Sequence, residues 1–587
     1  MTDFAERVDA FLADWFALEP VYATSVGMHD HDDRWPDQSA AGRAARIAAF
    51  ERWLSVFRGI RAAELSVDEG VDRDLLVAVL EAQLFDEHEL LEDAWSAMAW
   101  VYLIGQGFFG LVAREFAPLA DRLGSLAGRA ERLPAVLDAA RTRLVGMPGR
   151  PVDRLHADAA LNQWPGLIAI VDDAIGLGKA GAPDDPAVAA VMPRLRAARG
   201  IAADALSDFE RHLREVLLPE ADGEGRLGAE LFAAKMVHTL HDPEMTPDRI
   251  RSRAEREFAA IRAEMIRIAR EIALRWLAGE PAPDDDAALV RAVLDAIARE
   301  HPGRHDMLDA CREELGRIEA FCREVDLVGL ADEPLLIDWT PMFLRAFGGA
   351  MLSSPGPLDK GQKAIFSITP IPDDASDAEA ESALREDNDR MIRLLTIHEA
   401  VPGHYLQGVY ANRCESLARA IFGSGVYAEG WAVYVTQVMM DVGYGADDPA
   451  LLLTHWKYYL RSVTNALIDV GIHTAEMSED EAVSLMTEGG FQEEAQARAK
   501  YHRARLSSTQ LSTYFLGSLS FWDLEHEVRR RAAAASGDAR GADVVPEPRV
   551  VGGYGPTPGF VYRTHLEACL NHGAPSMPLL RRLVLGS

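Results

Sequence analysis

Two histidines and a glutamate lie close together in residues 398–407, which read His-Glu-Ala-Val-Pro-Gly-His-Tyr-Leu-Gln. In a His-Glu-x-x-His helix, the two imidazoles lie one turn apart and bind zinc, while the glutamate is free to activate water. The segment therefore predicts the zinc site of a hydrolase. His398 and His404 would bind the metal, and Glu399 would act as general base.

The spacing of these histidines departs from the usual pattern, because His398 and His404 are six residues apart. On a regular helix six residues rotate through about 240°, so the two imidazoles would point in different directions. Proline removes a backbone donor and glycine permits unusual dihedral angles. We therefore expect Pro402-Gly403 to bend the chain and bring both histidines onto one metal. The alternative is two unrelated core histidines.

A catalytic zinc ion needs a third protein ligand, for which Glu429 is the best candidate. It lies 25 residues after His404, far enough for the chain to return on a neighbouring antiparallel helix. Its surroundings, Tyr427-Ala-Glu-Gly-Trp-Ala-Val-Tyr434, are otherwise apolar, where an unpaired carboxylate would be costly. The alternative is an exposed glutamate at a helix start, with Asp441 or Glu415 as weaker substitutes.

The order of these residues resembles a bacterial family. His-Glu-x-x-Pro-Gly-His-x-x-Gln followed by Glu-Gly-Trp-Ala-x-Tyr is similar to the domain-of-unknown-function 885 family, placed in the zincin metallopeptidase clan. Pro20–Gly27 and His565–Gly573 resemble its opening and closing segments. More distantly, the chain is similar to thermostable carboxypeptidases, oligoendopeptidases and angiotensin-converting enzyme. The resemblance implies a helical body with a deep cleft, zinc on the two histidines and Glu429, and catalysis by Glu399.

A stripe of polar residues repeats along a helix that is predicted to be buried. Arg461, Asn465, Asp469 and His473 recur every four residues, among apolar residues on all sides of the helix. Buried polar groups need partners, which a catalytic cleft would provide. Asp469 is expected to orient a metal-binding imidazole, and Arg461 or His473 to meet a substrate carboxylate or carbonyl. A solvated helix face is the alternative.

Amide hydrolysis also needs a donor for the developing oxyanion. Tyr514 and His565 are the candidates, and Tyr554 in a glycine-rich loop is a rival. Gln407, at the end of the metal-type motif, is a further candidate for substrate contact. Each of these positions has an alternative as an ordinary core residue.

The elements that must position these residues are mainly helices. Apolar residues between Phe258 and Trp276 recur every three or four positions after Thr246-Pro247-Asp248, a typical helix start. Similar patterns cover much of residues 1–330. Further helices are predicted from the Ser376-x-x-Glu379 capping box to about Tyr410, over Val426–Asp441, over Leu451–Met477 and from Ser478 onward.

The pattern changes within residues 331–372. Leu-Leu-Ile-Asp-Trp and Ala-Ile-Phe-Ser-Ile flank a turn-rich Ser-Ser-Pro-Gly-Pro-Leu-Asp-Lys-Gly segment. This predicts a small β-hairpin or sheet beside the active site, with an edge strand onto which an extended peptide could bind, or alternatively a loop. The predicted fold class is mainly α. An N-terminal helical region (1–330) and a catalytic region (331–587) would form one continuous two-lobed body around a deep cleft.

Composition limits the expected partners. The 587 residues are 48% hydrophobic, which is typical of a folded globular chain, and the net charge of -32 repels phosphate backbones and anionic membranes. We therefore expect neither nucleic acid nor a membrane as partner, and the uncharged stretch Trp95–Ala113 is expected to be buried core. Four cysteines without a Cys-x-x-Cys pair, and a start without a signal-peptide pattern, favour the cytoplasm.

These observations predict a zinc-dependent peptidase. It would hydrolyse peptide bonds by metal-activated water with Glu399 as general base, on a peptide or small amide substrate. Two alternatives remain open at this point. The chain could be a catalytically inactive relative that binds peptides, or a zinc amidase that acts on a non-standard amide, because the motif specifies the chemistry and not the pocket.

Overall fold

The computed structural model of the chain is mainly α. Its residues are 71% helical, with a small three-stranded sheet, which confirms the predicted fold class. The structure describes residues 3–277, 279, 281–340, 345, 349–537 and 557–586. The chain forms two compact units, residues 1–226 with 355–362, and residues 227–354 with 363–587. The predicted boundary at residue 330 separates a helical region from a catalytic region. Because this boundary concerns function, it stays a prediction.

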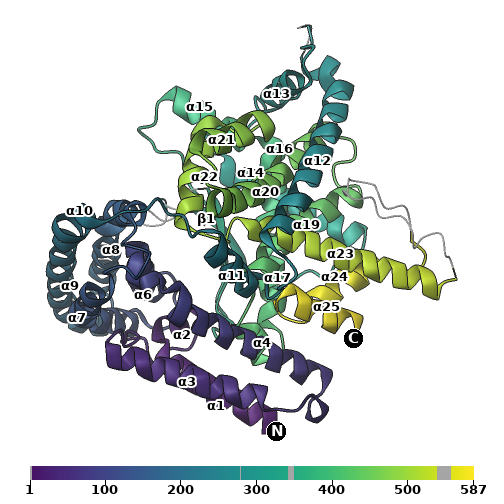
Figure 1. Cartoon of the computed structure of the whole chain (residues 1–587). Helices are drawn as coiled ribbons and strands as arrows, with labels where there is room; N and C mark the ends of the chain where they lie inside the picture. Colours follow the sequence, from purple (N-terminus) through teal and green to yellow (C-terminus); the bar gives the residue numbers. More distant parts are fainter. Residues whose placement is uncertain are drawn as a thin grey trace. The chain divides into compact units, whose positions relative to one another are not determined.

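The first unit consists of helices that pack in pairs, with α7 against α9, α6 against α8 and α3 against α4 (Figure 1). Two short π-helical turns, Asp86–Leu90 and Leu213–Leu217, interrupt its regular helices. The helices are α1 (Asp3–Leu18), α2 (Pro20–Ser25), α3 (Ala40–Arg58), α4 (Val67–Phe85), α5 (Glu92–Trp95), α6 (Ala97–Val112), α7 (Leu119–Arg143), α8 (Arg154–Gly181), α9 (Pro186–His212) and α10 (Leu218–Glu220).

The uncharged stretch in the first unit forms α6, whose Trp100, Ile104 and Phe108 are buried in the core. Among the described residues, no single helix is long and apolar enough to cross a membrane. One pair, Val67–Trp95 followed by Ala97–Val112, meets the length and composition criteria together, and it is bent by 98° at its break.

The second unit contains the sheet and the remaining helices. A π-helical turn, Leu485–Gly489, follows α21. The helices are α11 (Ala229–Leu240), α12 (Pro247–Trp276), α13 (Asp286–Ile297), α14 (Met307–Glu324), α15 (Asp377–Glu386), α16 (Asp389–Glu399), α17 (His404–Asn412), α18 (Leu417–Ile421), α19 (Gly425–Asp441), α20 (Pro449–Ala475), α21 (Glu479–Ser484), α22 (Glu494–Leu506), α23 (Ser512–Ala535), α24 (Tyr562–Leu570) and α25 (Met577–Leu585).

The long amphipathic helix predicted after Thr246 is confirmed as α12. The Thr246 side chain caps it by accepting a hydrogen bond from the Arg249 N–H at 3.4 Å. The helix predicted from Ser376 to Tyr410 is instead three helices, α15, α16 and α17. Asn388 starts α16 by accepting hydrogen bonds from the N–H groups of the two residues at 390 and 391, so its side chain separates α16 from α15.

The predicted β element is a sheet in the order β1 (Leu335–Trp339), β3 (Ala364–Ile368), β2 (Ala350–Ser353). β1 and β3 are the two predicted strands, but they run parallel, so they do not form a hairpin with each other. β2 pairs with β3 in antiparallel orientation and was missed because its run is only four residues long. Ile337, Phe366 and Ile368 pack in a cluster with residues of α14 and α16, which places the sheet beside the metal-type motif.

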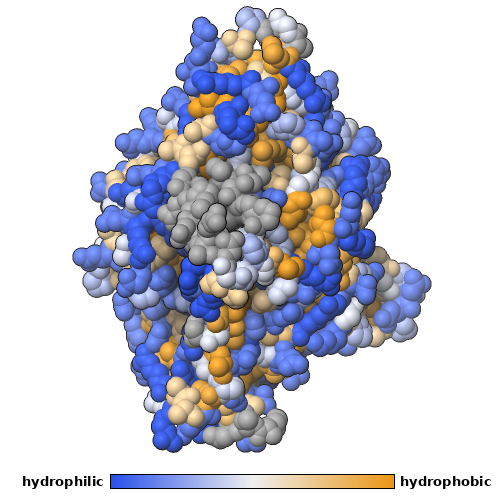
Figure 2. Space-filling view, turned by 90° about the vertical axis from the view of Figure 1, so that its right-hand side faces the viewer, coloured by the Kyte–Doolittle hydropathy of each residue, from blue (hydrophilic) through white to orange (hydrophobic). Residues whose placement is uncertain are grey.

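The molecular surface is mainly polar on the face that Figure 2 shows. The face shown in Figure 2 is largely hydrophilic, with hydrophobic groups scattered between the polar ones. Scattered exposed hydrophobic residues are normal on globular proteins and do not by themselves indicate a function.

Helices α19 and α23 cross in close backbone contact, where a glycine of each helix meets the other. A Cβ atom added to Gly430 would lie 2.4 Å from the Cα of Gly517, and one added to Gly517 would lie 2.1 Å from the carbonyl oxygen of Val426. Real Cβ atoms do not approach backbone so closely, so neither position has room for a side chain. The distance between these helices therefore depends on both glycines.

We predict that Gly517→Ala destabilises the fold. Alanine improves helix propensity by up to about 1 kcal/mol, but overpacking at a helix crossing costs about 1–3 kcal/mol. The urea midpoint should fall. Gly316→Ala is the matched control, because Gly316 lies exposed in α14 with open space around it, and it should raise the midpoint slightly. A Gly517→Ala midpoint at or above that of the control would contradict the predicted contact.

Candidate metal centre

The chain between α16 and α17 turns His404 back toward His398. α16 ends at Glu399 and α17 begins at His404. The Gly403 N–H donates to the Ile397 carbonyl at 3.0 Å, and the Leu406 N–H donates to the Ala400 carbonyl at 3.3 Å. Both hydrogen bonds span six residues, whereas a regular α-helix spans four. The two additional residues form the bend, and the predicted break at Pro402-Gly403 is present.

Glycine is required at position 403, because a Cβ atom there would lie 1.9 Å from the carbonyl oxygen of His398. The Val401–Pro402 peptide bond preceding it is cis. The carbonyl of Pro402 accepts a hydrogen bond from the indole N–H of Trp431 at 2.9 Å. Trp431 is fully buried on α19, two residues after Glu429, so this bond ties the bend to the helix that carries the third candidate ligand.

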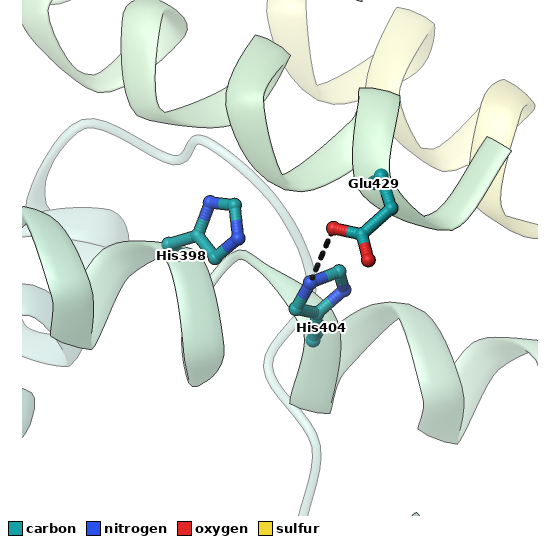
Figure 3. A group of neighbouring side chains, drawn as sticks. All are labelled: His398, His404 and Glu429. Carbon is teal, nitrogen blue, oxygen red and sulfur yellow. Dashed lines mark ion pairs between the residues drawn. The ribbon is translucent and has the colours of Figure 1, made fainter. Parts of the chain in front are cut away.

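His398, His404 and Glu429 converge (Figure 3). One ligand atom from each residue can be chosen so that all three lie within 4.8 Å of one another. The imidazole centroids are 4.8 Å apart, and His404 Nε2 lies 3.6 Å from Glu429 Oε2. Ligand atoms of a tetrahedral zinc site are about 3.4 Å apart, so these side chains need only small shifts to bind one ion. Of the substitutes, Asp441 lies three turns further along α19, and Glu415 is exposed.

The buried polar atoms fit a metal ion. His398 is buried, and one nitrogen of its ring faces His404 and Glu429 (Figure 3). Two imidazoles with a carboxylate are a donor set that zinc favours. These three residues could therefore hold a metal ion with one position left open.

Electrostatics in the cluster differ from residue to residue. Burial, then the neighbouring His404, lower the pKa of His398 well below its usual value, so His398 is neutral and able to bind a metal. Burial acts to lower the pKa of His404 as well, but Glu429 and Glu399 outweigh it and raise that pKa. Burial raises the pKa of Glu399 to about 7, with His404 acting in the opposite direction.

Tyr458 is a residue of this site that the sequence analysis missed. Its ring packs edge-on against the His398 imidazole, with centroids 5.7 Å apart, and burial raises the pKa of its hydroxyl, with Glu399 and Glu429 close enough to contribute. No hydrogen bond from this hydroxyl is found within the described part of the chain. It lies on α20 three residues before Arg461, so extending the polar stripe by one turn could have found it.

Asp469 does not contact the two candidate metal-binding histidines. Its carboxylate accepts hydrogen bonds from the Thr509 N–H at 3.2 Å, from the Ser512 N–H at 3.1 Å and from the Ser512 hydroxyl at 2.6 Å. These bonds hold the start of α23. The expectation that Asp469 orients a metal-binding imidazole therefore does not agree with its position, because both carboxylate oxygens face the loop before α23.

His473 is also a structural residue in this arrangement. Its Nδ1 accepts a hydrogen bond from the Leu227 N–H at 3.2 Å, and its Nε2 lies 3.0 Å from the Ala504 carbonyl. Its ring stacks on Phe232 at 5.2 Å. Both nitrogens are therefore engaged away from the cluster, and the expected contact with substrate does not agree with this position.

Four further predicted residues remain, namely Tyr514, His565, Gln407 and Tyr554. Tyr514 lies on α23 near Glu429, which with burial raises its pKa, and its hydroxyl accepts a hydrogen bond from the Gln510 amide at 3.3 Å. His565 packs against the rings of Tyr434 and Phe560 rather than against the cluster. Gln407 is buried on α17, three residues after His404, and Tyr554 lies outside the described residues.

Comparisons with known proteins place the chain in a family. A family model described as "Bacterial protein of unknown function (DUF885)" matches residues 20–542, and the chain belongs to this family. No curated protein matches it.

Two solved structures are similar to the whole chain. One is described as a "putative lipoprotein of unknown function" from Shewanella oneidensis, with 28% identity over 100% of both chains and a TM-score of 0.82. The other is a "putative lipoprotein" from Colwellia psychrerythraea, with 16% identity over 100% of this chain and 99% of that chain, and a TM-score of 0.78. At 16% identity the second likeness shows the fold alone.

Proposed function

We propose that this chain is a zinc-dependent peptidase of the zincin type. The observation that carries the proposal is the convergence of His398, His404 and Glu429 beside a second buried glutamate, Glu399. Three protein ligands with one open position are typical of catalytic zinc, whereas structural zinc sites are closed by four.

Zinc bound here would polarise the scissile carbonyl and lower the pKa of a water molecule. Glu399 supplies the proton transfers. At a pKa of about 7, about half of its carboxylate is ionised at pH 7 and able to take a proton from the attacking water, and the resulting acid can pass the proton to the leaving amine. Burial therefore suits Glu399 to both steps.

Strand β2 supports a peptide as substrate. It is an edge of the sheet, and it packs against α16, which carries Glu399. The backbone N–H of Leu352 in β2 is close enough to Glu399 to lower its pKa, against the larger effect of burial. A peptide that pairs with this edge would therefore bring its carbonyl groups next to the general base.

Tyr458 is the best-placed donor for the developing oxyanion. Its hydroxyl is near Glu399 and Glu429, and burial keeps it protonated. Tyr514 is the rival, because it is close to Glu429 and the hydrogen bond that its hydroxyl accepts from the Gln510 amide leaves its own O–H available to donate, but only Tyr458 has a ring contact with His398. The earlier candidate His565 packs on Tyr434 and is less suited to this role.

We retain the cytoplasm as the proposed location on the basis of the sequence pattern. The two similar structures are both described as lipoproteins, so a different location would follow if this chain shared that property. Fractionation of cells that produce the natural protein separates the two possibilities.

Purified protein should contain about one zinc ion per chain, measured by inductively coupled plasma mass spectrometry. His398→Ala, His404→Ala and Glu429→Ala should each lose most of it, because two protein ligands hold zinc poorly. His502→Ala is the matched control, since His502 is exposed on α22, and it should retain the metal. Equal zinc content in all four variants would exclude this site.

Glu399→Gln should abolish peptide cleavage while zinc stays bound. Loss of a general base lowers the rate by about 100-fold to 10,000-fold, and the amide cannot accept the proton. Cleavage of a random peptide library is followed by mass spectrometry, with the exposed Glu415→Gln as control. Retained cleavage would refute the role of Glu399. Zinc bound by the unaltered protein without cleavage of any peptide would favour the amidase or the peptide-binding alternative.

Tyr458→Phe should lower kcat by about 100-fold with little change in KM, because it removes a hydroxyl that acts on the oxyanion and keeps the ring packing on His398. Tyr514→Phe is the matched comparison and should have the smaller effect. Steady-state kinetics on one cleaved peptide measures both variants. If the order of the two effects is reversed, the donor is Tyr514.

A further inference from the structure

Two cations, Lys457 and Arg461, face the carboxylate of Glu386. Lys457 Nζ lies 3.7 Å from Glu386 Oε2, and Arg461 Nη1 lies 3.5 Å from Glu386 Oε1. Lys457 and Arg461 are one turn apart on α20, whereas Glu386 is the last residue of α15. Both distances are longer than a normal N–H···O hydrogen bond of 2.7–3.2 Å, so Glu386 binds each cation loosely.

The cations have donors to spare. An arginine carries five N–H donors and a lysine three. No other hydrogen bond or ion pair of the Lys457 or Arg461 side chain is found in the part of the chain that the structure describes. Arg461 also lies over the Tyr458 ring, with Cζ 5.9 Å from the ring centroid. This cation–π contact orients the guanidinium but leaves its N–H donors available for hydrogen bonds.

These donors line a cavity. Lys457, Tyr458, Arg461 and Glu386 line it, and Leu294, Ile297 and Met391 supply apolar groups to the same lining. This narrow cavity shares Leu294, Ala298, Glu386 and Lys457 with a wider one of about 360 Å³. The lining of the wider cavity also includes Arg291 and Arg385, together with the acidic residues Asp295, Glu381 and Glu493. A small ligand group could therefore reach the two cations from the surface.

The cavity is close to the metal centre. Tyr458 contacts the His398 ring and also lies under Arg461. These two contacts place the guanidinium within about 12 Å of the His398 ring, the length of roughly three extended residues. About three extended residues on the direct path would therefore reach from a peptide bond held at the metal to a group that binds Arg461.

We propose that Arg461 and Lys457 bind the free C-terminal carboxylate of the substrate, one to three residues from the cleaved bond. The inference rests on the proposed peptidase function. It implies that the protein is a carboxypeptidase that removes short C-terminal segments from a peptide. An arginine with a lysine is the pair that suits a carboxylate, because the guanidinium can donate two parallel hydrogen bonds and the ammonium adds a second charge.

Glu386 and Asp387, the acidic residues beside the two cations, do not favour an amine instead. Burial acts to raise the pKa of Glu386, but Lys457 and Arg461 outweigh it and lower the pKa, so Glu386 is ionised and engaged by both cations. Asp387 is its neighbour. Burial raises the pKa of Asp387 to about 6, and no ion pair of Asp387 with either cation is found within the described residues. Glu386 therefore holds the cations in place for a second carboxylate.

The binding test uses protein that carries Glu399→Gln, so that substrates are not consumed. Peptides that this protein enriches from a random pentapeptide library are resynthesised with a C-terminal carboxylate or a carboxamide, and Kd is measured by calorimetry. The carboxylate form should bind at least 10-fold more tightly. A third form, amidated but with glutamate as last residue, distinguishes the terminal carboxylate from an acidic side chain and should bind like the amide.

Added to this background, Arg461→Gln should reduce the carboxylate preference to near one, Lys457→Gln should reduce it in part, and Arg461→Lys should restore part of it. Arg267→Gln is the matched control, because Arg267 is an exposed residue of α12 paired with Glu264, and it should keep the full preference. Circular dichroism confirms that each variant is folded. Enrichment of no peptide, equal binding of the two forms, or a preference that survives Arg461→Gln would overturn the inference.

The outcomes separate this inference from the proposed function. If zinc-loaded unaltered protein cleaves carboxylate and amide peptides equally well, the peptidase proposal stands and the carboxylate subsite is wrong. If the Glu399→Gln protein prefers the carboxylate form but the unaltered protein cleaves neither, the subsite stands as a peptide-binding site and the hydrolytic function fails.

Discussion

The contact of the Gly403 backbone with the carbonyl of His398 is the constraint on which the site depends. A regular helix would place His404 on a different side from His398. The chain avoids this by inserting two residues, so that hydrogen bonds at the bend span six residues instead of four. The inserted backbone must then lie against the preceding turn, where only glycine leaves enough room. Both imidazoles can face one point only because this position has no side chain.

The bend between α16 and α17 is supported by a series of contacts that runs through α19 and α23 to α20. Trp431 of α19 donates a hydrogen bond to Pro402 in the bend. α19 in turn packs closely against α23 at Gly517. Asp469 of α20 holds the start of α23 by accepting hydrogen bonds from the backbone N–H and the hydroxyl of Ser512. A buried carboxylate is stable only when its hydrogen bonds are made. Asp469 thus acts on the site through the position of a helix.

The charges around His404 would allow a metal ion to replace the proton that this histidine carries. His398 is neutral, whereas Glu429 and Glu399 favour the protonated form of His404. A cation bound between these residues would take over the role of that proton and would leave Glu399 as the base. The loosely held Lys457 and Arg461 follow the same principle, since half-buried cations with unused donors remain available for a ligand.

The sequence by itself determined the residues of the candidate metal centre and the local structure. The order of His398, Glu399 and His404, the break at Pro402-Gly403 and the apolar setting of Glu429 were readable because they depend on residue type and on neighbours along the chain. Periodicity identified the long helices for the same reason.

Only the tertiary structure decided which distant residues meet. The parallel pairing of β1 with β3, the contact of Tyr458 with His398 and the removal of Asp469 and His473 from the predicted site all depend on how helices pack. Periodicity shows which residues share one face of a helix, but not which element covers that face. The sequence therefore predicted that the polar stripe on α20 is buried. Its hydrogen-bond partners became known only from the tertiary structure.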